Sequence, residues 1–356
     1  MSKTIYYYGI DNNYGGMENY AFNLIKGILS KDSSISFHVI SMFNDYAYRD
    51  ELEAMGVSSS IVPNKRKHPF KYIKEIRKIL INHNEDDFIQ INQMSYSNFL
   101  LYKAIKKSNI KVLVVAHGAG IPGRLHNIIH NIGKKKYINI GNKLAVSTDA
   151  SKFMFNNTNN VSIIPNGIDS NRFIFNKEYR EEIRSKYNIA NDTFAIGFIG
   201  RLSKLKNPLF AVQVMELLLD NPNIQLYMFG KEEDPYINEY ISSRELSNVH
   251  ILGESKETYK IYSALDMFIF PSIHESQGIS LYEALANGLK CIVSPNIPLV
   301  KVEQNNITIL ELNSILWARY ILDNLNIDYP RINLIKDSQY ELDNQIDKYI
   351  DLYKNI

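Results

Sequence analysis

The sequence predicts an α/β protein with two domains, each built on a doubly wound parallel sheet. Its 356 residues exceed the roughly 250 to 300 at which a single hydrophobic core stops growing, so two domains are favoured over one very large domain. Short β-rich runs alternate with segments of helical periodicity along the whole chain. The strands are almost continuously apolar, which is typical of parallel sheets covered by helices on both faces.

The strand-like runs fall into two groups separated by a polar stretch. The first group is TIYYYGI, FHVISMF, DFIQIN, KVLVVAHG and KLAVST, and the second is FAIGFIG, IQLYMFG, VHILG, MFIFPS and KCIVSP. Helical periodicity is clearest over 17–29, 70–81, 210–219, 256–264 and 279–286. We therefore expect Rossmann-like domains over 1–170 and 171–335, joined just after IIPNGID. A last helix within 336–356 has an apolar face, and one option for it is to cross back to the first domain.

Composition narrows the class of protein. Hydrophobic residues make up 45% of the chain and charged residues 22%, which is ordinary for a globular protein and excludes fibrous and disordered classes. The single cysteine, Cys291, cannot form an internal disulfide and is expected to pack as a small apolar residue. The start, MSKTIYYYGI, lacks the basic region and following apolar stretch of a signal peptide, and no apolar run reaches the ~18 residues needed to span a bilayer, so we expect neither export nor membrane spanning. These features predict a cytoplasmic protein.

Charge is distributed unevenly along the chain. Residues 1–170 contain 21 Lys and Arg against 13 Asp and Glu, whereas the remainder contains 19 against 25. Much of the excess lies in a predicted basic helix over 63–80, where apolar residues recur at helical spacing among lysines. Such a helix could contact an anionic membrane peripherally, or it could pack on its own domain with solvated lysines. Nucleic acid is a weaker option, because no aromatic-interleaved basic stripe or metal-finger spacing accompanies the charge.

Glycines and cations stand where ligands bind in open α/β sheets, just beyond the carboxyl ends of strands. The first strand is followed by DNNYGGMEN, with Gly15 and Gly16 before a helix, and not by the G-x-G-x-x-G of nicotinamide enzymes. This loop is either a tight turn or a site for a phosphate or sugar hydroxyl. In the second half, FIGRLSKLKNP places Arg201 and Lys206 at a strand-to-helix turn, where two cations can neutralise a diphosphate.

The segment PSIHESQGISLYEALANGLKCIVSP, at 271–295, carries the strongest functional signal. Glu275 lies in a loop after a strand, and Glu283 falls inside the following helix, with seven residues between them. Gly278 stands where that helix begins, and a helix N-terminus with glycine suits a phosphate. One carboxylate before the helix and one within it can each bind a pair of sugar hydroxyls. Two glutamates at this spacing are common by chance, so the prediction depends on their setting.

Taken together, these motifs resemble the retaining family 4 glycosyltransferases. The likeness extends through YGGME at 14–18, VLVVAHG, AVST, IIPNGID with Phe173, IGFIGRLSKLKNP and the segment at 271–295, and so covers both domains in order. The resemblance implies the GT-B fold, in which two Rossmann-like domains face a central cleft. The first domain would bind the acceptor and the second the nucleotide-sugar, within bacterial surface polysaccharide synthesis such as capsule or O-antigen assembly.

The resemblance also implies a role for each site residue. Arg201 and Lys206 match the family's diphosphate-binding pair, Glu283 the carboxylate that holds the donor ribose, and Glu275 the residue that faces the transferred sugar. The family's other donor contacts come from the backbone N–H groups after the first glutamate and from the glycine loop, and a first-domain histidine lies near the reacting centre. In this sequence they correspond to Gln277, Gly278, Ile279, Gly15, Gly16 and His117.

The predicted reaction moves a hexose or N-acetylhexosamine, without a metal, from a nucleotide-sugar such as a UDP-sugar to a glycan or lipid-linked acceptor. The protein would therefore be cytoplasmic, or peripheral at the inner face of the membrane. Two alternatives stay open, a sugar-nucleotide epimerase of the same fold and a non-catalytic nucleotide-binding subunit. Gln277 replaces an aromatic residue that is frequent in the family, and the stretch after Cys291 lacks the usual glycine-rich loop. The donor base and sugar, the acceptor and the linkage are left open.

Overall fold

The protein folds into two compact units. The computed structural model describes residues 3–13, 15–118, 120, 123–275, 277–295, 297, 306–325, 327 and 329–356. The first unit comprises 1–167 together with 342–356, and the second comprises 168–341. The domain ends predicted from the sequence, at 170 and 335, lie within six residues of the boundaries between the units, after 167 and 341. The chain therefore returns to the first unit for its last segment.

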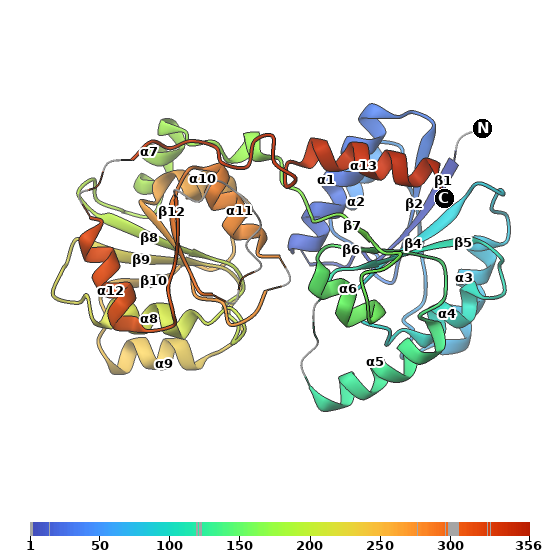
Figure 1. The fold of residues 1–356 in the computed structure, drawn as a ribbon, viewed down its shortest axis with the longest axis horizontal. Helices are drawn as coiled ribbons and strands as arrows, with labels where there is room; N and C mark the ends of the chain where they lie inside the picture. The colour runs from blue at the N-terminus through green and yellow to red at the C-terminus, as the bar shows by residue number, and fades with distance from the viewer. Residues whose placement is uncertain are drawn as a thin grey trace. The chain divides into compact units, whose positions relative to one another are not determined.

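The first unit is built on a parallel sheet with the strand order β3-β2-β1-β4-β5-β6-β7 (Figure 1). Its strands are β1 (Lys3–Tyr8), β2 (Ile35–Ser41), β3 (Ser58–Ile61), β4 (Phe88–Gln93), β5 (Lys111–Ala116), β6 (Asn142–Ala145) and β7 (Ser162–Ile163). Its helices are α1 (Gly16–Lys31), α2 (Arg49–Ala54), α3 (Pro69–Leu80), α4 (Phe99–Ile105), α5 (Arg124–Tyr137), α6 (Thr148–Phe155) and α13 (Leu342–Lys354).

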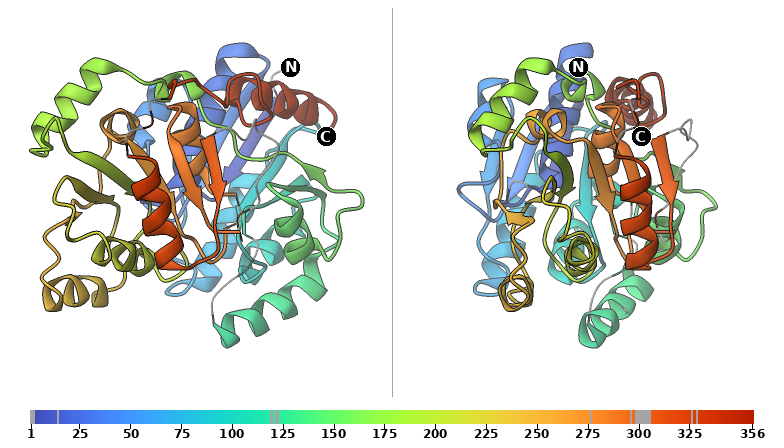
Figure 2. Two further views of the ribbon diagram at one scale, coloured as in Figure 1. Left: turned by 60° about the vertical axis from the view of Figure 1, so that its left-hand side comes forward. Right: turned by 90° about the vertical axis from the view of Figure 1, so that its left-hand side faces the viewer.

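Alternate residues of these strands face two separate apolar cores, one on each side of the sheet. On one side, Tyr7 and Val39 pack with α1, α2 and α13. On the other, Ile89 and Val114 pack with α3 to α6. Figure 2 shows the ribbon of the chain from two further directions. Burial on both faces explains why the strands read as nearly continuous apolar runs. The predicted doubly wound architecture is confirmed for this unit.

Helix α3 starts later than predicted, and the structure shows which way its apolar side chains point. The predicted basic helix over 63–80 begins only at Pro69, because proline disfavours helical backbone at the preceding residue and suits the first helical position. Its apolar stripe faces inward, with Tyr72, Ile76 and Leu80 fully buried. Most of the stripe that suggested a membrane contact is therefore part of the domain core, whereas Phe70, in the first turn, is 85% exposed and the lysines occupy the outer face.

The second unit is built on a parallel sheet with the order β10-β9-β8-β11-β12-β13 (Figure 1). Its strands are β8 (Phe194–Ile199), β9 (Ile224–Phe229), β10 (Val249–Ile251), β11 (Met267–Phe270), β12 (Lys290–Val293) and β13 (Ile307–Ile309). Its helices are α7 (Lys177–Lys186), α8 (Pro208–Glu216), α9 (Tyr236–Ser243), α10 (Thr258–Ala264), α11 (Ile279–Ala286), α12 (Ser314–Asp323) and a short 3₁₀ helix (Ser170–Phe173).

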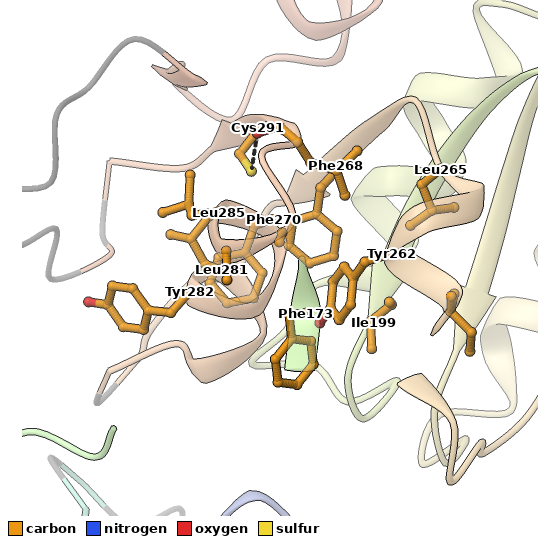
Figure 3. Close-up of a cluster of buried hydrophobic side chains, with 14 of the residues drawn as sticks. Phe173, Ile199, Tyr262, Leu265, Phe268, Phe270, Leu281, Tyr282, Leu285 and Cys291 are labelled. Carbon is orange, nitrogen blue, oxygen red and sulfur yellow. Dashed lines mark hydrogen bonds between the residues drawn. The ribbon is translucent and has the colours of Figure 1, made fainter. Parts of the chain in front are cut away.

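This sheet also separates two cores. Helices α8, α9 and α12 pack on one face around Trp317. Helices α7, α10 and α11 cover the other, where Figure 3 shows the rings of Tyr262, Phe268 and Phe270 gathered beside α11. The free cysteine, Cys291, is buried in this second core, and it packs as a small apolar side chain. The doubly wound architecture is confirmed here too.

The last helix, α13, is tightly fitted to the first unit. Ile346 packs on α1 at Gly27, where any Cβ would overlap the isoleucine Cδ1. The Tyr353 hydroxyl donates to Gln90 Oε1 on β4 at 2.6 Å, and Lys3 Nζ donates to the Tyr353 carbonyl at 2.6 Å. Among the residues that the structure describes, no helix is both long and apolar enough to cross a membrane.

We expect Ile346→Ala to destabilise the first unit by about 2 to 5 kcal/mol, because it leaves a cavity against α1. Urea unfolding of the full chain measures this loss. Ile315→Ala is the matched control, since Ile315 on α12 is 68% exposed and should change stability by less than about 0.5 kcal/mol. Equal unfolding midpoints for Ile346→Ala and the unaltered chain would show that α13 does not stabilise this unit.

Candidate functional site

The predicted donor residues lie on loops that follow two neighbouring strands of the second unit. Strands β8 and β11 pair in parallel, with Met267 opposite Ile196 and Phe268 opposite Gly197. Their carboxyl ends therefore reach the same edge of the sheet, where ligands bind in folds of this class. The two loops are joined directly, since Ile273 N donates to the Leu205 carbonyl at 2.8 Å.

A buried ion pair connects these loops. Lys206 Nζ donates to Glu275 Oε1, and the hydroxyl of Ser272 donates to the same oxygen at 2.8 Å. The Glu275 side chain is only 8% exposed and that of Lys206 only 20%. The ammonium group also lies 5.3 Å from the centre of the Phe270 ring. A carboxylate this well buried needs such partners, because an unpaired buried charge is strongly destabilising.

Arg201 is held more loosely. Its side chain is 65% exposed and its guanidinium pairs with Glu233 at 3.2 Å. Since surface ion pairs contribute little stability, this contact leaves Arg201 able to exchange Glu233 for another anion. Arg201 and Lys206 belong to one strand-to-helix loop, but each is paired with a different carboxylate.

The turn before α11 requires glycine. Gly278 is the N-cap of α11 with φ +82°, and an added Cβ would lie 3.0 Å from the Phe270 ring. Gln277 is buried and Ile279 is partly buried. A helix N-terminus carries backbone N–H groups without intrahelical acceptors, so the first turn of α11 can donate to an anion. Ser276 lies outside the described residues.

Glu283 lies one turn into α11 and accepts a hydrogen bond from the Tyr262 hydroxyl at 2.6 Å. Burial raises the pKa of this carboxyl to about 7, although the Tyr262 hydrogen bond and the nearby Arg172 act in the opposite direction. Desolvation therefore outweighs both favourable partners. The structure thus brings Lys206, Glu275 and Gly278 close together, while Glu283 pairs with Tyr262.

In the first unit, the glycine loop after β1 is fixed by an acidic side chain. Gly15 is the N-cap of α1, Gly16 is its first residue, and Glu18 follows at the third helical position. Burial raises the pKa of the Glu18 carboxyl, while hydrogen bonds from the backbone N–H groups of Glu18 itself, Asp11 and Gly15 act in the opposite direction. This is the returning half of a capping box. Tyr14, part of the YGGME motif, lies outside the described residues.

His117 follows β5 and is buried. Its Nε2 lies 3.1 Å from Asn92 Oδ1, and the Asn92 amide nitrogen donates to the Tyr8 carbonyl at 3.2 Å. Because Oδ1 can only accept, Nε2 carries the proton. Burial lowers the His117 pKa to about 4, so the ring is neutral near pH 7. Its Nδ1 has no hydrogen-bond partner within the part of the chain that the structure describes.

Sequence reasoning missed the residues that support this site. Ser272, Tyr262 and Asn92 each hold a predicted side chain, and Glu18 holds the glycine loop. Asn92 gave some signal, because it is one of three polar residues, with Gln90 and Gln93, in a strand that is buried almost throughout. Ser272 and Tyr262 gave none, since nothing in the sequence indicates which hydroxyl will meet a given carboxylate. Within the described ranges, no group of three or more His, Cys, Asp or Glu side chains is placed to hold a metal ion.

Comparisons with known proteins agree with the two-unit architecture. The family model described as Glycosyltransferase Family 4 matches residues 14–172, and that described as Glycosyl transferases group 1 matches 179–321. By these matches the chain is a family 4-type glycosyltransferase. The glycosyltransferase is 25% identical to EpsF of Bacillus subtilis, a protein classed as a glycosyltransferase, over 93% of this chain and 90% of EpsF.

A second relative is more similar over a shorter stretch. It is the UDP-Gal:alpha-D-GlcNAc-diphosphoundecaprenol alpha-1,3-galactosyltransferase of Escherichia coli, 30% identical over 44% of this chain and 42% of that protein. Relatives also include the capsular polysaccharide biosynthesis glycosyltransferase CapM of Staphylococcus aureus, 29% identical over 34% of this chain and 32% of CapM. Relatives of the glycosyltransferase thus act in polysaccharide biosynthesis.

Solved structures establish the fold of the glycosyltransferase. HepE of Anabaena, in complex with UDP-glucose, matches with a TM-score of 0.80 over 99% of this chain and all of HepE, at 15% identity. A glycosyltransferase from Rickettsia africae matches with a TM-score of 0.78 over 99% of this chain and 98% of that protein, at 20% identity. The predicted GT-B fold is confirmed. Much of the unusual stretch after Cys291, at 296 and 298–305, lies outside the described residues.

We expect Glu283 to make the stability of the glycosyltransferase depend on pH. Its folded pKa of about 7 lies above its ordinary value of 4.5, so its ionisation costs stability above pH 7 and that cost disappears as pH falls toward 4.5. Glu283→Gln removes the cost. The melting temperature of Glu283→Gln minus that of the unaltered chain should therefore be larger at pH 8 than at pH 5.

Glu257→Gln is the control for this experiment. Hydrogen bonds from Lys260 and Lys186 lower the pKa of Glu257, so it remains ionised over pH 5 to 8. Its effect on the melting temperature should be the same at both ends of that range. If the effect of Glu283→Gln on the melting temperature is also equal at pH 5 and pH 8, Glu283 ionises well below pH 7.

Proposed function

We propose that the protein is a retaining hexosyltransferase. It would move a hexose or N-acetylhexosamine from a nucleotide-sugar, by preference a UDP-sugar, to a glycan or lipid-linked acceptor in bacterial surface polysaccharide synthesis. One observation carries the proposal: Lys206, Glu275 and Gly278 meet at the carboxyl edge of the sheet, beside a helix N-terminus. This arrangement joins a cation, a carboxylate and backbone donors, the groups that a sugar diphosphate requires.

Two cations would bind the diphosphate. Cleavage at the anomeric carbon leaves negative charge on the phosphate oxygen, and fixed positive groups stabilise that charge as it develops. Arg201 supplies a planar guanidinium on an exposed side chain, and Lys206 supplies a mostly buried ammonium. In the free protein both are paired with carboxylates. Binding of the donor would replace Glu233 at Arg201 and share Lys206 with Glu275.

The remaining donor contacts would come from α11 and its N-terminus. Backbone N–H groups of Gln277, Gly278 and Ile279 are proposed to hold the sugar and phosphate. Glu283 is proposed to accept hydrogen bonds from the ribose hydroxyls. This role suits a carboxylate that already receives a hydrogen bond from Tyr262, because that bond fixes its orientation.

Retention would follow from substitution on one face of the sugar, with the leaving phosphate accepting the acceptor proton. Glu275 is proposed to orient the sugar and not to attack it, with Lys206 and Ser272 fixing the position of its carboxylate. Gly15, Gly16 and His117 are proposed to contact the donor or the acceptor near the reacting centre. A neutral His117 is suited to hydrogen bonding there, since burial lowers its pKa to about 4.

The acceptor class is supported by the names of relatives. One transfers galactose to a diphosphoundecaprenol-linked sugar, and others are alpha-monoglucosyldiacylglycerol synthases.

Release of nucleotide across a panel of donors, with such acceptors present, tests the reaction, and NMR of the product's anomeric configuration tests retention. Conversion of the donor without any acceptor would indicate an epimerase. Nucleotide binding with no turnover would indicate a non-catalytic subunit.

We expect Arg201→Ala to lower kcat/KM by about 100-fold or more, because one charge-stabilising contact to the leaving group is lost. Arg244→Ala is the matched control, since Arg244 is also exposed and pairs with one carboxylate, Glu216, in the same unit. That control should keep nearly full activity. Near-normal kinetics for Arg201→Ala would contradict the diphosphate assignment.

We expect Glu283→Ala to act differently from Arg201→Ala. Loss of the ribose contact removes an interaction that is equally strong before and during the reaction, so KM for the donor should rise while kcat changes little. Initial rates over a range of donor concentrations separate the two constants. A fall in kcat at unchanged KM would assign Glu283 to the reacting centre and not to the ribose.

A further inference from the structure

Helix α5 (Arg124–Tyr137) turns an apolar face away from its own domain. Leu125, Ile128 and Ile132 are 69%, 49% and 57% exposed. Their spacing of three and four residues places them on one side of the helix. A helix that packs only on its own domain shows the opposite arrangement, with apolar residues inward and polar residues outward.

The inward face of α5 is fixed by close contacts, so the helix cannot roll to bury its apolar side. His130 Nδ1 accepts from the Tyr96 backbone N–H at 3.2 Å, and the Tyr137 ring stacks on Tyr102 at 4.9 Å. At Gly133, any Cβ would overlap the Tyr96 carbonyl oxygen. Only glycine permits this approach, and it fixes which face of α5 points outward.

Positive charge lies beside the exposed apolar side chains. The helix begins with Arg124 and carries Lys134, Lys135 and Lys136 in its last turn, and it contains no Asp or Glu. Lys134 donates to the Phe153 carbonyl, whereas Lys135 and Lys136 are exposed. Apolar residues flanked by cations are the pattern of a helix that lies in the interface of an anionic bilayer.

We propose that α5 is an interfacial helix that binds the first unit to an anionic lipid membrane through Leu125, Ile128 and Ile132, with Lys135 and Lys136 against the headgroups. Helix α3 differs, because its apolar stripe is buried apart from Phe70 in the first turn, and its outer face carries lysines. Figures 1 and 2 show α5 on the outside of the unit, apart from the strands. The proposal concerns lipid binding alone, so it is tested without any sugar donor.

Vesicle flotation of the full chain tests this proposal. The unaltered protein should float with vesicles of phosphatidylglycerol and phosphatidylcholine at low salt, and float far less with phosphatidylcholine alone. Replacing Leu125, Ile128 and Ile132 together with serine should lower the bound fraction at least tenfold. The matched control replaces three exposed apolar residues of α12 with serine and should bind as the unaltered chain does; they are Ile315, Leu316 and Leu322.

A second variant separates α5 from α3. Lys71→Gln, Lys74→Gln and Lys78→Gln together remove charge from α3 and should leave most vesicle binding intact. The proposal is overturned if this variant loses binding while the α5 variant retains it, or if the unaltered chain does not bind anionic vesicles. It is also overturned if light scattering shows a dimer that the α5 substitutions dissociate, because a second copy of the chain would then cover this face.

Tryptophan fluorescence gives an independent measurement. The only native tryptophan, Trp317, is buried in the second unit, so its emission should not respond to lipid. Ile128→Trp adds a reporter at the centre of the exposed face. Anionic vesicles should shift its emission to shorter wavelength, as expected for a ring that leaves water. An unchanged spectrum at vesicle concentrations that float the protein would exclude α5 from the contact.

Discussion

The site in the second unit depends on the pairing of β8 with β11. These strands are far apart in sequence, yet their hydrogen bonding brings the ends of both to one edge of the sheet. The loops that follow must therefore run side by side, and Lys206 on one meets Glu275 on the other. Neither side chain would be stable alone in this setting, because each is largely buried and needs an opposite charge.

That ion pair has a chemical consequence. The two glutamates of the motif have different partners. Glu275 contacts Lys206 and Ser272 through one of its oxygens, whereas Glu283 has the Tyr262 hydroxyl and the nearby Arg172, and burial raises its pKa. Two glutamates from one sequence motif thus differ in their environments. Because a lysine holds its carboxylate, Glu275 can orient a sugar. Because burial raises its pKa, Glu283 would bind hydroxyl groups in a way that depends on pH.

The sequence predicts the fold well because the strands of a parallel sheet are buried on both faces. Such strands are nearly continuously apolar, and this pattern is visible in the sequence. It also predicts that Lys206 and Glu275 stand at strand ends, since glycines and cations mark those turns. It does not predict Ser272 or Tyr262 as their partners, because a side-chain hydrogen bond depends on packing between segments with no common local pattern. Periodicity fails differently for α3, where it finds an apolar stripe without indicating whether the stripe points inward.

Helices α3 and α5 show what decides that direction. Both contain three lysines and one arginine together with aliphatic residues, but the cations of α3 are spread along the helix, whereas those of α5 stand in its first and last turns. In α3, large residues such as Tyr72 and Leu80 fill the core, so the lysines face water. In α5, Gly133 brings the backbone against Tyr96, while His130 and Tyr137 supply ring contacts. Since a glycine and two polar rings make the inward face, the aliphatic residues are left outside. The residue that determines the orientation of α5 therefore has no side chain, which is why hydrophobic periodicity alone does not reveal the exposed face.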